Sequence, residues 1–332
     1  MSVNSALTTD SASRGPSPVR LWLSRQGPVF GIYGVVLLLV IIGTLSNERF
    51  LHPLNIRNIL SFAAPIAILG LGMAFVLFTG EIDLSVGSTI SLSSIILGTY
   101  MDKSVSMIVP VVLLALAAGA LVGVANGLLV AYVGVPSFVA TLATLLVVGG
   151  INFVWTKGGP RSNIPKEFRL LSEGRLDVWP VSTVVVIVVM SGIAWLIAHR
   201  TRFGRQLFII GSNPVAARVA GIDVARVKLA AYVLSGMFAA VAGMYITARV
   251  GSAQSDVGRG MELSAIAAAV LGGISLFGGR GHVLSAVGGG LVLGILFNLL
   301  ILLGFPTEAQ LITTGVVVVA AVLLYSRLAH LR

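Results

Sequence analysis

The chain has 332 residues, of which 56% are hydrophobic and only 10% are charged, with a formal net charge of +10. Soluble domains carry about 25% charged residues, so this composition excludes a soluble globular protein and indicates an all-α, polytopic membrane protein. The chain has no cysteine, which excludes disulfides and thiolate-bound metals. The basic residues lie mostly in loops between apolar segments, so they indicate membrane orientation rather than nucleic-acid binding.

The first half of the chain predicts a tail and five spans. Residues 1–27 are rich in Ser, Thr and Pro, and we expect a disordered cytoplasmic tail. No small-residue cleavage site follows the apolar segment 28–45, which we interpret as a retained span and not as a signal peptide. About 20 apolar residues cross the hydrocarbon core. Further spans are expected at 59–79, 84–101, 105–133 and 137–155.

The second half predicts five more spans, at 180–198, 229–247, 263–277, 283–303 and 308–326. Ten spans in a permease domain of 28–326 place both termini and the polar loop 200–228 in the cytoplasm. Five basic residues flank that loop, in agreement with the positive-inside rule: Arg200, Arg202, Arg205, Arg226 and Lys228. The loop 156–179 also carries five basic residues and argues against this orientation.

The loop 200–228 contains the signals of a short helix at about 214–220. Asn213 is a suitable N-cap, Pro214 fits the first helical position, and Gly221 fits a left-handed C-terminal cap. The helix comprises Pro214, Val215, Ala216, Ala217, Arg218 and Val219, with the two valines on one face. A helix this short is marginal alone, so it must pack on its own membrane helices or on a partner protein.

Two carboxylates lie in the tight turn between the second and third predicted spans. Asp83 or Ser85 can cap the helix that follows, because a carboxylate at a helix N-terminus binds free amides. Glu81 and Asp83 are also the main candidates for a direct role in transport, since ionisable groups near membrane depth are rare. Both interpretations stay open.

Several other residues suggest contacts inside the membrane. Gly119, Gly123 and Gly127 recur every four residues and predict a face for close helix packing. Asn126 and Asn298 either bond a neighbouring helix or line a polar path. A Gly-x-Pro turn precedes both the fifth and the tenth predicted span, at 134–136 and 304–306, which is a faint sign of an inverted repeat.

Signatures of an enzyme are missing from the sequence. None of the four histidines lies in an HExxH motif, and no lysine follows a glycine, so there is no Walker A motif. The chain therefore does not predict its own ATPase, and we expect no metal and no cofactor in it.

Three stretches resemble the bacterial ABC sugar permeases of the ribose, xylose and galactofuranose type. GEIDLSVG, from Gly80 to Gly87, is similar to the GGIDLSVG signature of that family. TRFGR (201–205), GSN (211–213) and AAR through GI (216–222) resemble its cytoplasmic loop. ELSAIA (262–267), beginning at Glu262, and LGG through GGRG (271–281) resemble its third signature.

The resemblance, which covers about 58–326, implies an importer subunit of the bacterial inner membrane. It implies a second permease subunit, an extracytoplasmic solute-binding protein, a sugar substrate, and a cytoplasmic ATPase that binds ATP and Mg²⁺ and docks on the 214–220 coupling helix. Two residues depart from the family pattern: Glu81 replaces a usual glycine, and Ser264 replaces a usual aspartate. A charge at position 81 is tolerated only if it faces water or a cation.

Other functions remain open on the sequence alone. A secondary carrier or channel would use Glu81 and Asp83 for a proton or cation and would need no ATPase. An ABC permease for a nucleoside or a branched-chain amino acid is the nearest alternative in substrate, and a non-transporting scaffold is a third.

Overall fold

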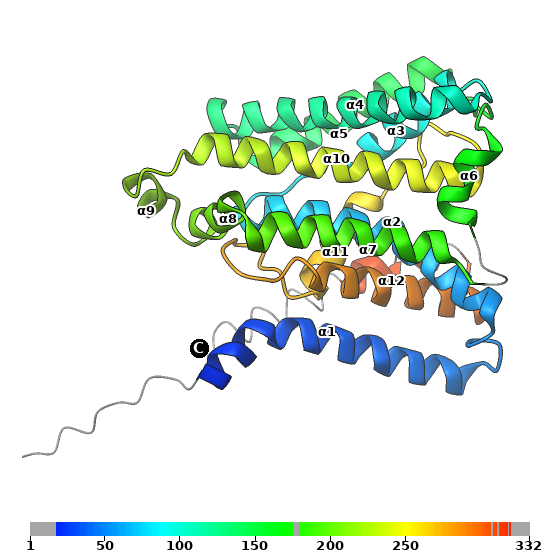
Figure 1. Ribbon diagram of the computed structural model, residues 1–332, viewed down its shortest axis with the longest axis horizontal. Helices are drawn as coiled ribbons and strands as arrows, with labels where there is room; N and C mark the ends of the chain where they lie inside the picture. The colour runs from blue at the N-terminus through cyan, green and yellow to red at the C-terminus, as the bar shows by residue number, and fades with distance from the viewer. Residues whose placement is uncertain (1–17, 175–178, 307, 311, 318, 320–332) are drawn as a thin grey trace, which may run out of the picture.

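The computed structural model describes residues 18–174, 179–306, 308–310, 312–317 and 319, and every named element in this part of the chain is helical (Figure 1). The α-helices of the first half are α1 (Pro18–Ser46), α2 (Pro53–Phe78), α3 (Val86–Tyr100), α4 (Ile108–Leu128) and α5 (Ser137–Thr156). Those of the second half are α6 (Lys166–Glu173), α7 (Val181–Trp195), α8 (Arg202–Ser212), α9 (Pro214–Val219), α10 (Val224–Val250), α11 (Met261–Leu271) and α12 (Ser285–Leu302). Short 3₁₀ or π turns extend α4 at both ends and α7 at its C-terminal end: η1 (Val105–Met107), η2 (Leu129–Val133) and η3 (Leu196–Arg200).

Seven helices in the described residues are long and apolar enough to cross a membrane, whereas nine of the ten predicted spans fall in this part of the chain, so the predicted count is too high there. The expected spans at 84–101 and 263–277 are the shorter helices α3 and α11. Asp102 and Lys103 adopt positive φ just after α3, and Gly273, with φ 81°, follows α11. Both helices are mostly buried, so their apolar side chains contact protein. Much of the expected span 308–326 lies outside the described residues.

The first helix begins earlier than the sequence predicts. α1 starts at Pro18, so residues 18–27 are helical and not part of a disordered tail. Proline is well tolerated at the first helical position, where its missing N–H is not needed. The remainder of the predicted tail, 1–17, lies outside the described residues.

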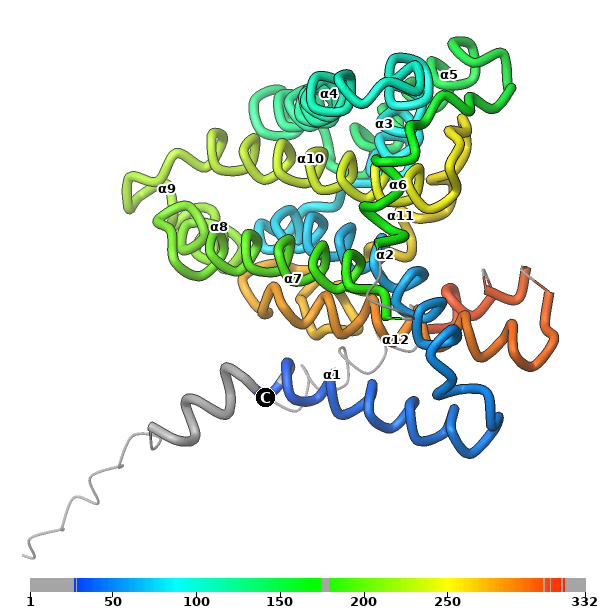
Figure 2. The backbone as a smooth tube through the Cα atoms, turned by 45° about the vertical axis from the view of Figure 1, so that its right-hand side comes forward, coloured from blue at the N-terminus to red at the C-terminus, as the bar shows by residue number. Residues whose placement is uncertain are grey.

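The most buried of the long helices, α2, α10 and α12, lie inside the molecule, and α1, α4, α5 and α7 lie around them (Figure 2). In the most apolar window of each helix, 83% of α2 is buried, against 11% of α1. α10 and α12 are also mostly buried, whereas α4, α5 and α7 present most of their apolar side chains outward. α2 packs against both α10 and α12, and α1 lies beside α12. The outward apolar faces fit contact with lipid acyl chains.

The glycine ladder of α4 lies directly on α10. A Cβ atom built on Gly123 would lie 2.3 Å from the carbonyl oxygen of Tyr232, and one on Gly119 would lie 2.4 Å from that of Gly236. On Gly127 it would lie 2.8 Å from the Cα atom of Leu229. The absence of side chains on this face therefore allows the two backbones to touch.

The two halves repeat one order of elements in opposite directions. A long helix, a short buried helix, a long helix and a Gly-x-Pro turn follow one another as α2, α3, α4 and 134–136, and again as α10, α11, α12 and 304–306. α2 and α10 run in opposite directions (Figure 1). Gly134 and Gly304 both have positive φ. This arrangement agrees with the inverted repeat that the two turns suggest.

Candidate functional site

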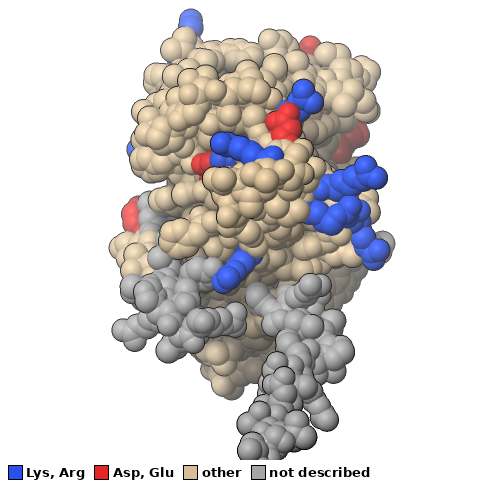
Figure 3. All heavy atoms as spheres, turned by 90° about the vertical axis from the view of Figure 1, so that its left-hand side faces the viewer, with Lys and Arg blue, Asp and Glu red and all other residues tan. Residues whose placement is uncertain are grey.

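Polar and basic residues gather at the end of the molecule that carries α8 and α9. Figure 3 looks at this end, where several Lys and Arg side chains project from a largely uncharged surface. Six exposed arginines belong to this end or its adjoining loops: Arg200, Arg202, Arg205, Arg218, Arg226 and Arg280. Such a concentration of arginine beside membrane helices is typical of a cytoplasmic face.

The helix α9 has the caps that its sequence predicts. The Oδ1 atom of Asn213 accepts hydrogen bonds from the backbone N–H groups of Val215 and Ala216, both at 3.0 Å. At the other end Gly221 has φ 78°, and the N–H of Ile222 donates to the carbonyl of Ala217 at 3.0 Å. These bonds fix the helix ends although the helix itself has only six residues.

The two faces of α9 have different surroundings. Ala217 is fully buried and belongs to the hydrophobic core, together with Leu207 and Ile210 of α8. Val215 and Val219 are 66% and 86% exposed. The helix thus packs on its own chain through one face, and it presents two valines to the solvent at the basic end of the molecule.

The helix α8 is absent from the sequence prediction, although the sequence contains its signals. Thr201 accepts a hydrogen bond from the N–H of Gly204 at 3.0 Å and caps the helix. Gly204, Leu207 and Ile210 recur every three residues and are buried. An N-cap followed by this spacing is the pattern of an amphipathic helix. α8 and α9 together form a helical hairpin that projects at the left of Figure 1.

A cluster of glycines joins this hairpin to two other segments, and we refer to Gly80, Gly211, Gly278 and Gly279 as the glycine junction. A Cβ atom on Gly211 of α8 would lie 2.0 Å from the carbonyl oxygen of Phe78 and 2.3 Å from the backbone nitrogen of Gly279. The N–H of Gly279 donates to that same carbonyl at 3.0 Å. Gly80, Gly278 and Gly279 all have positive φ, which L side chains rarely adopt. Three distant parts of the chain therefore meet through backbone alone.

The turn after α2 places its two carboxylates in different environments. Glu81 forms an ion pair with Lys228 of α10, and both side chains are 18% exposed. The departure from glycine at position 81 is thus compensated by a cation. The close packing of the turn is retained, since a Cβ atom on Gly80 would lie 3.3 Å from the carbonyl oxygen of Phe277.

Asp83 is fully buried and connects the turn to the helices around it. Its Oδ1 atom accepts from the backbone N–H of Ser85 at 3.0 Å and from the Ser85 hydroxyl at 2.6 Å. Its Oδ2 atom accepts from the hydroxyl of Ser235 in α10 at 2.8 Å. Asn126 of α4 donates to the Ser85 hydroxyl at 2.7 Å. The carboxylate thus fixes the turn before α3, whose N-cap residue is Ser85, and links it to α4 and α10, but it accepts no hydrogen bond from an amide inside the helix.

The other candidate polar residues lie in three separate places. Asn298 forms two reciprocal hydrogen bonds with Asn55 of α2, at 2.8 and 3.0 Å, so it bonds a neighbouring helix. Gly87 lies beside Glu262, because a Cβ atom at this position would lie 2.2 Å from the Oε2 atom of Glu262. Ser264 lines a cavity at the opposite end of the molecule from α9. Glu262 and Ser264 both belong to the first turn of α11, whereas Asn298 belongs to α12.

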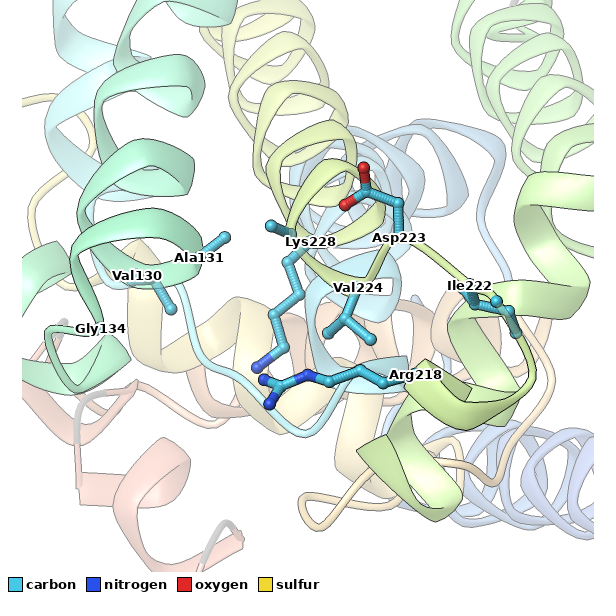
Figure 4. Close-up of a pocket in the computed structure, with 10 residues that line it drawn as sticks. Val130, Ala131, Gly134, Arg218, Ile222, Asp223, Val224 and Lys228 are labelled. Atoms are coloured by element: carbon cyan, nitrogen blue, oxygen red, sulfur yellow. The ribbon is translucent and has the colours of Figure 1, made fainter. Parts of the chain in front are cut away.

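A cavity of about 620 Å³ lies beside α9 (Figure 4). The start of α10, the turn after α4 and the end of α9 line it. Arg218 and Lys228 point toward each other across it, whereas Asp223 points away. The cavity therefore brings Arg218 close to the Lys228 side of the Glu81–Lys228 ion pair, at the end of the molecule that carries α8 and α9.

The described residues form an apolar helical bundle with a capped helical hairpin at one end. Among the described residues, no group of three or more His, Cys, Asp and Glu side chains lies close enough to hold a metal ion. An apolar helical bundle with a capped, partly exposed hairpin at one end defines the class of a multi-pass transport permease.

Comparison with known proteins agrees with this class. Residues 55–322 match the family of branched-chain amino acid transport system permease components, and the chain belongs to this family. It is 40% identical to the ribose import permease protein RbsC of Bacillus subtilis, over 91% of this chain and 92% of the relative. It is 34% identical to the galactose/methyl galactoside import permease protein MglC of Haemophilus influenzae, over 88% and 92%. It is 36% identical to the autoinducer 2 import system permease protein LsrC of Enterobacter sp., over 92% of this chain and 87% of the relative. No solved structure matches the chain.

Proposed function

We propose that this chain is the membrane-spanning subunit of an ATP-binding-cassette importer that moves a sugar or sugar-like solute into the cytoplasm. The relatives named above are import permeases for ribose, galactose or methyl galactoside, and autoinducer 2, and their alignments cover nearly the whole chain. A second permease subunit would complete the pore, and an extracytoplasmic binding protein would deliver the solute.

The observation that carries the proposal is the exposed face of α9. Val215 and Val219 are apolar, largely exposed and held in place by two helix caps. Exposed apolar side chains beside exposed arginines are suited to a protein partner. The partner is a cytoplasmic ATPase that binds ATP and Mg²⁺, because the chain has no Walker A motif of its own. We therefore propose that α9 faces the cytoplasm at the bacterial inner membrane, and that both chain termini lie on this same side.

The glycine junction explains how movement of α9 would reach the membrane helices. Gly211 of α8 touches the end of α2 and the loop before α12 without any intervening side chain. Backbone contacts of this kind resist compression, so a displacement of the hairpin moves the attached helix ends as a body. The pore would open alternately to the two sides as the ATPases close and separate.

The structure offers less support for a secondary carrier that uses Glu81 and Asp83. Both oxygens of Asp83 already accept hydrogen bonds from the protein, and Glu81 is paired with Lys228. A carrier would have to break these contacts in each cycle. The same contacts are expected of a turn that fixes the start of α3.

The test compares two exposed positions at the end of α9. Val219→Asp introduces a charge on the apolar face, and Ala220→Asp, one residue further, is the control because Ala220 is also exposed but lies off that face. Ala217 is unsuitable for this test, since it is buried and its replacement would displace α9 itself. The tagged chains are purified in mild detergent, and the bound ATPase and sugar uptake are measured. We expect Val219→Asp to lose the ATPase and uptake, and Ala220→Asp to keep both. Equal retention of the ATPase by the two variants would contradict docking on α9.

A further inference from the structure

A second cavity, of about 430 Å³, lies at the end of the molecule opposite to α9. Arg249, in the last turn of α10, lines it, whereas Lys228, in the second turn of the same helix, lines the cavity beside α9. Apolar side chains of α2, α10, α11 and α12 form most of its wall. Six polar or charged side chains also reach it: Arg249, Arg259, Ser264, Glu308, Gln310 and Thr314.

Arg249 is the most informative of these residues. One Nη atom donates to the carbonyl of Ser61 at 2.8 Å, and the guanidinium lies over the ring of Phe62, 4.8 Å from its centre. None of the ion pairs among the described residues involves Arg249. A guanidinium has five N–H groups, so most of its donors are left for whatever occupies the cavity. Such a partly buried cation needs hydrogen-bond acceptors to offset its lost hydration.

The mixture of donors and acceptors identifies the chemistry of the occupant. The two arginines only donate, Glu308 only accepts when ionised, and Gln310, Ser264 and Thr314 do both. A compound with several hydroxyl groups satisfies all of them, because each hydroxyl both donates and accepts. A phosphate or carboxylate would satisfy the arginines but would be repelled by Glu308. The apolar wall fits the C–H faces of a sugar ring, and the volume lies in the range of about 300–1,000 Å³ of small-molecule sites.

We propose that this cavity is a binding site for a neutral monosaccharide within the permease. The site receives the solute at the extracytoplasmic end before the pore opens inward. The choice of a sugar and the extracytoplasmic side rest on the proposed function, whereas the lining of the site rests on the cavity alone. Its affinity must be weak, because a solute that is to move on must also leave.

The absence of cysteine allows a direct test of occupancy. Gln310→Cys places a single thiol in the cavity, and Ser106→Cys places one on the exposed 3₁₀ turn η1, outside the cavity. The full-length variants, in proteoliposomes with the ATPase and the binding protein, are treated with a membrane-impermeant thiol reagent with and without D-ribose or D-galactose. We expect one of these sugars to slow modification of Gln310→Cys, in a concentration-dependent manner, and to leave Ser106→Cys unaffected. If the thiol reagent modifies Gln310→Cys at the same rate with either sugar as without sugar, the proposal is overturned.

A matched pair of threonines tests the contacts. The Thr314 and Thr313 hydroxyls both donate to a carbonyl one turn earlier, but only Thr314 lines the cavity. Both substitutions are made in the Gln310→Cys chain, and the sugar concentration that halves the rate of modification is measured. Thr314→Val should raise this concentration about fivefold through the loss of a neutral hydrogen bond, and Arg249→Met should raise it about tenfold through the loss of a charged one. Thr313→Val should leave it unchanged. Equal effects of the two threonine variants would contradict the site even if Arg249→Met fails to fold.

Uptake by the unmodified chain separates this inference from the proposed function. If neither these sugars nor any other sugar is taken up in the presence of ATP and all partners, the proposed function fails. If D-ribose or D-galactose is taken up normally but does not protect Gln310→Cys, only the binding site fails.

Discussion

The contact between α4 and α10 makes a quantitative prediction at Gly123. A Cβ atom there would lie 2.3 Å from the carbonyl oxygen of Tyr232 and 2.6 Å from the Cα atom of Val233. Real Cβ contacts are essentially never below 3.0 Å, so Gly123→Ala must move the helices apart by at least about 0.7 Å. The neighbours are backbone atoms and have no alternative rotamer, so overpacking should cost about 1–3 kcal/mol. The better helix propensity of alanine offsets about 1 kcal/mol of this cost.

The control for this prediction is Gly150→Ala on α5. Gly150 is also inside a helix, is exposed, and has nothing within 4 Å of the position of its Cβ atom, so alanine should stabilise the chain by up to about 1 kcal/mol. The two variants should therefore differ by roughly 2 kcal/mol. Unfolding of the purified proteins by a titration of SDS in mixed micelles measures this difference. If Gly123→Ala is as stable as Gly150→Ala, α4 and α10 are not in backbone contact at Gly123.

Three further substitutions test single contacts by the same unfolding measurement. Glu81→Gln leaves Lys228 without its partner and should destabilise the chain. The exchange of the two residues, Glu81→Lys with Lys228→Glu, should recover part of this loss, and no recovery would contradict the ion pair. Asn298→Leu leaves Asn55 without its reciprocal hydrogen bonds and should lower the free energy of unfolding by about 1 kcal/mol. Replacing both asparagines with leucine should lower it by less than the sum of the two single changes, and strict additivity would contradict the pair. Asp223→Ala removes the N-cap of α10 and should cost about 1 kcal/mol, whereas Asp223→Asn should cost less; equal losses would show that the cap is unimportant.

The long spans could be predicted from the sequence because length and hydropathy define them almost completely. The expected segment 105–133 coincides with the observed span, and the expected 137–155 differs from it by one residue at its end. Hydropathy failed at α3 and α11 for a physical reason. A helix buried in protein and a helix exposed to lipid are equally apolar, so composition does not reveal that α3 begins only at Val86 or that α11 already ends at Leu271.

The candidate site could be predicted only where its determinants are local. The caps of α9 follow from Asn213 and Gly221, which act on neighbours in the sequence. The partners of Asp83 and Glu81 come from α10, about 150 residues further along the chain. No spacing rule connects positions that distant. The burial of Ala217 likewise depends on where α9 folds back, and the sequence could not distinguish its packing face from its exposed face.

The glycine junction explains why three motifs that are separate in the sequence contribute to one contact in the structure. Gly80 lies in the first signature, Gly211 in the stretch that resembles the second signature of the family, and Gly278 and Gly279 in the third signature. A side chain at Gly211 would collide with the Phe78 carbonyl and with Gly279, and one at Gly278 would lie 2.8 Å from the backbone nitrogen of Gly80, while Gly80 itself has positive φ. The carbonyl of Phe78 accepts the N–H of Gly279 at the same point. The glycines of the three motifs therefore all serve a single contact. This contact joins the exposed hairpin to the end of α2 and to the loop that leads into α12.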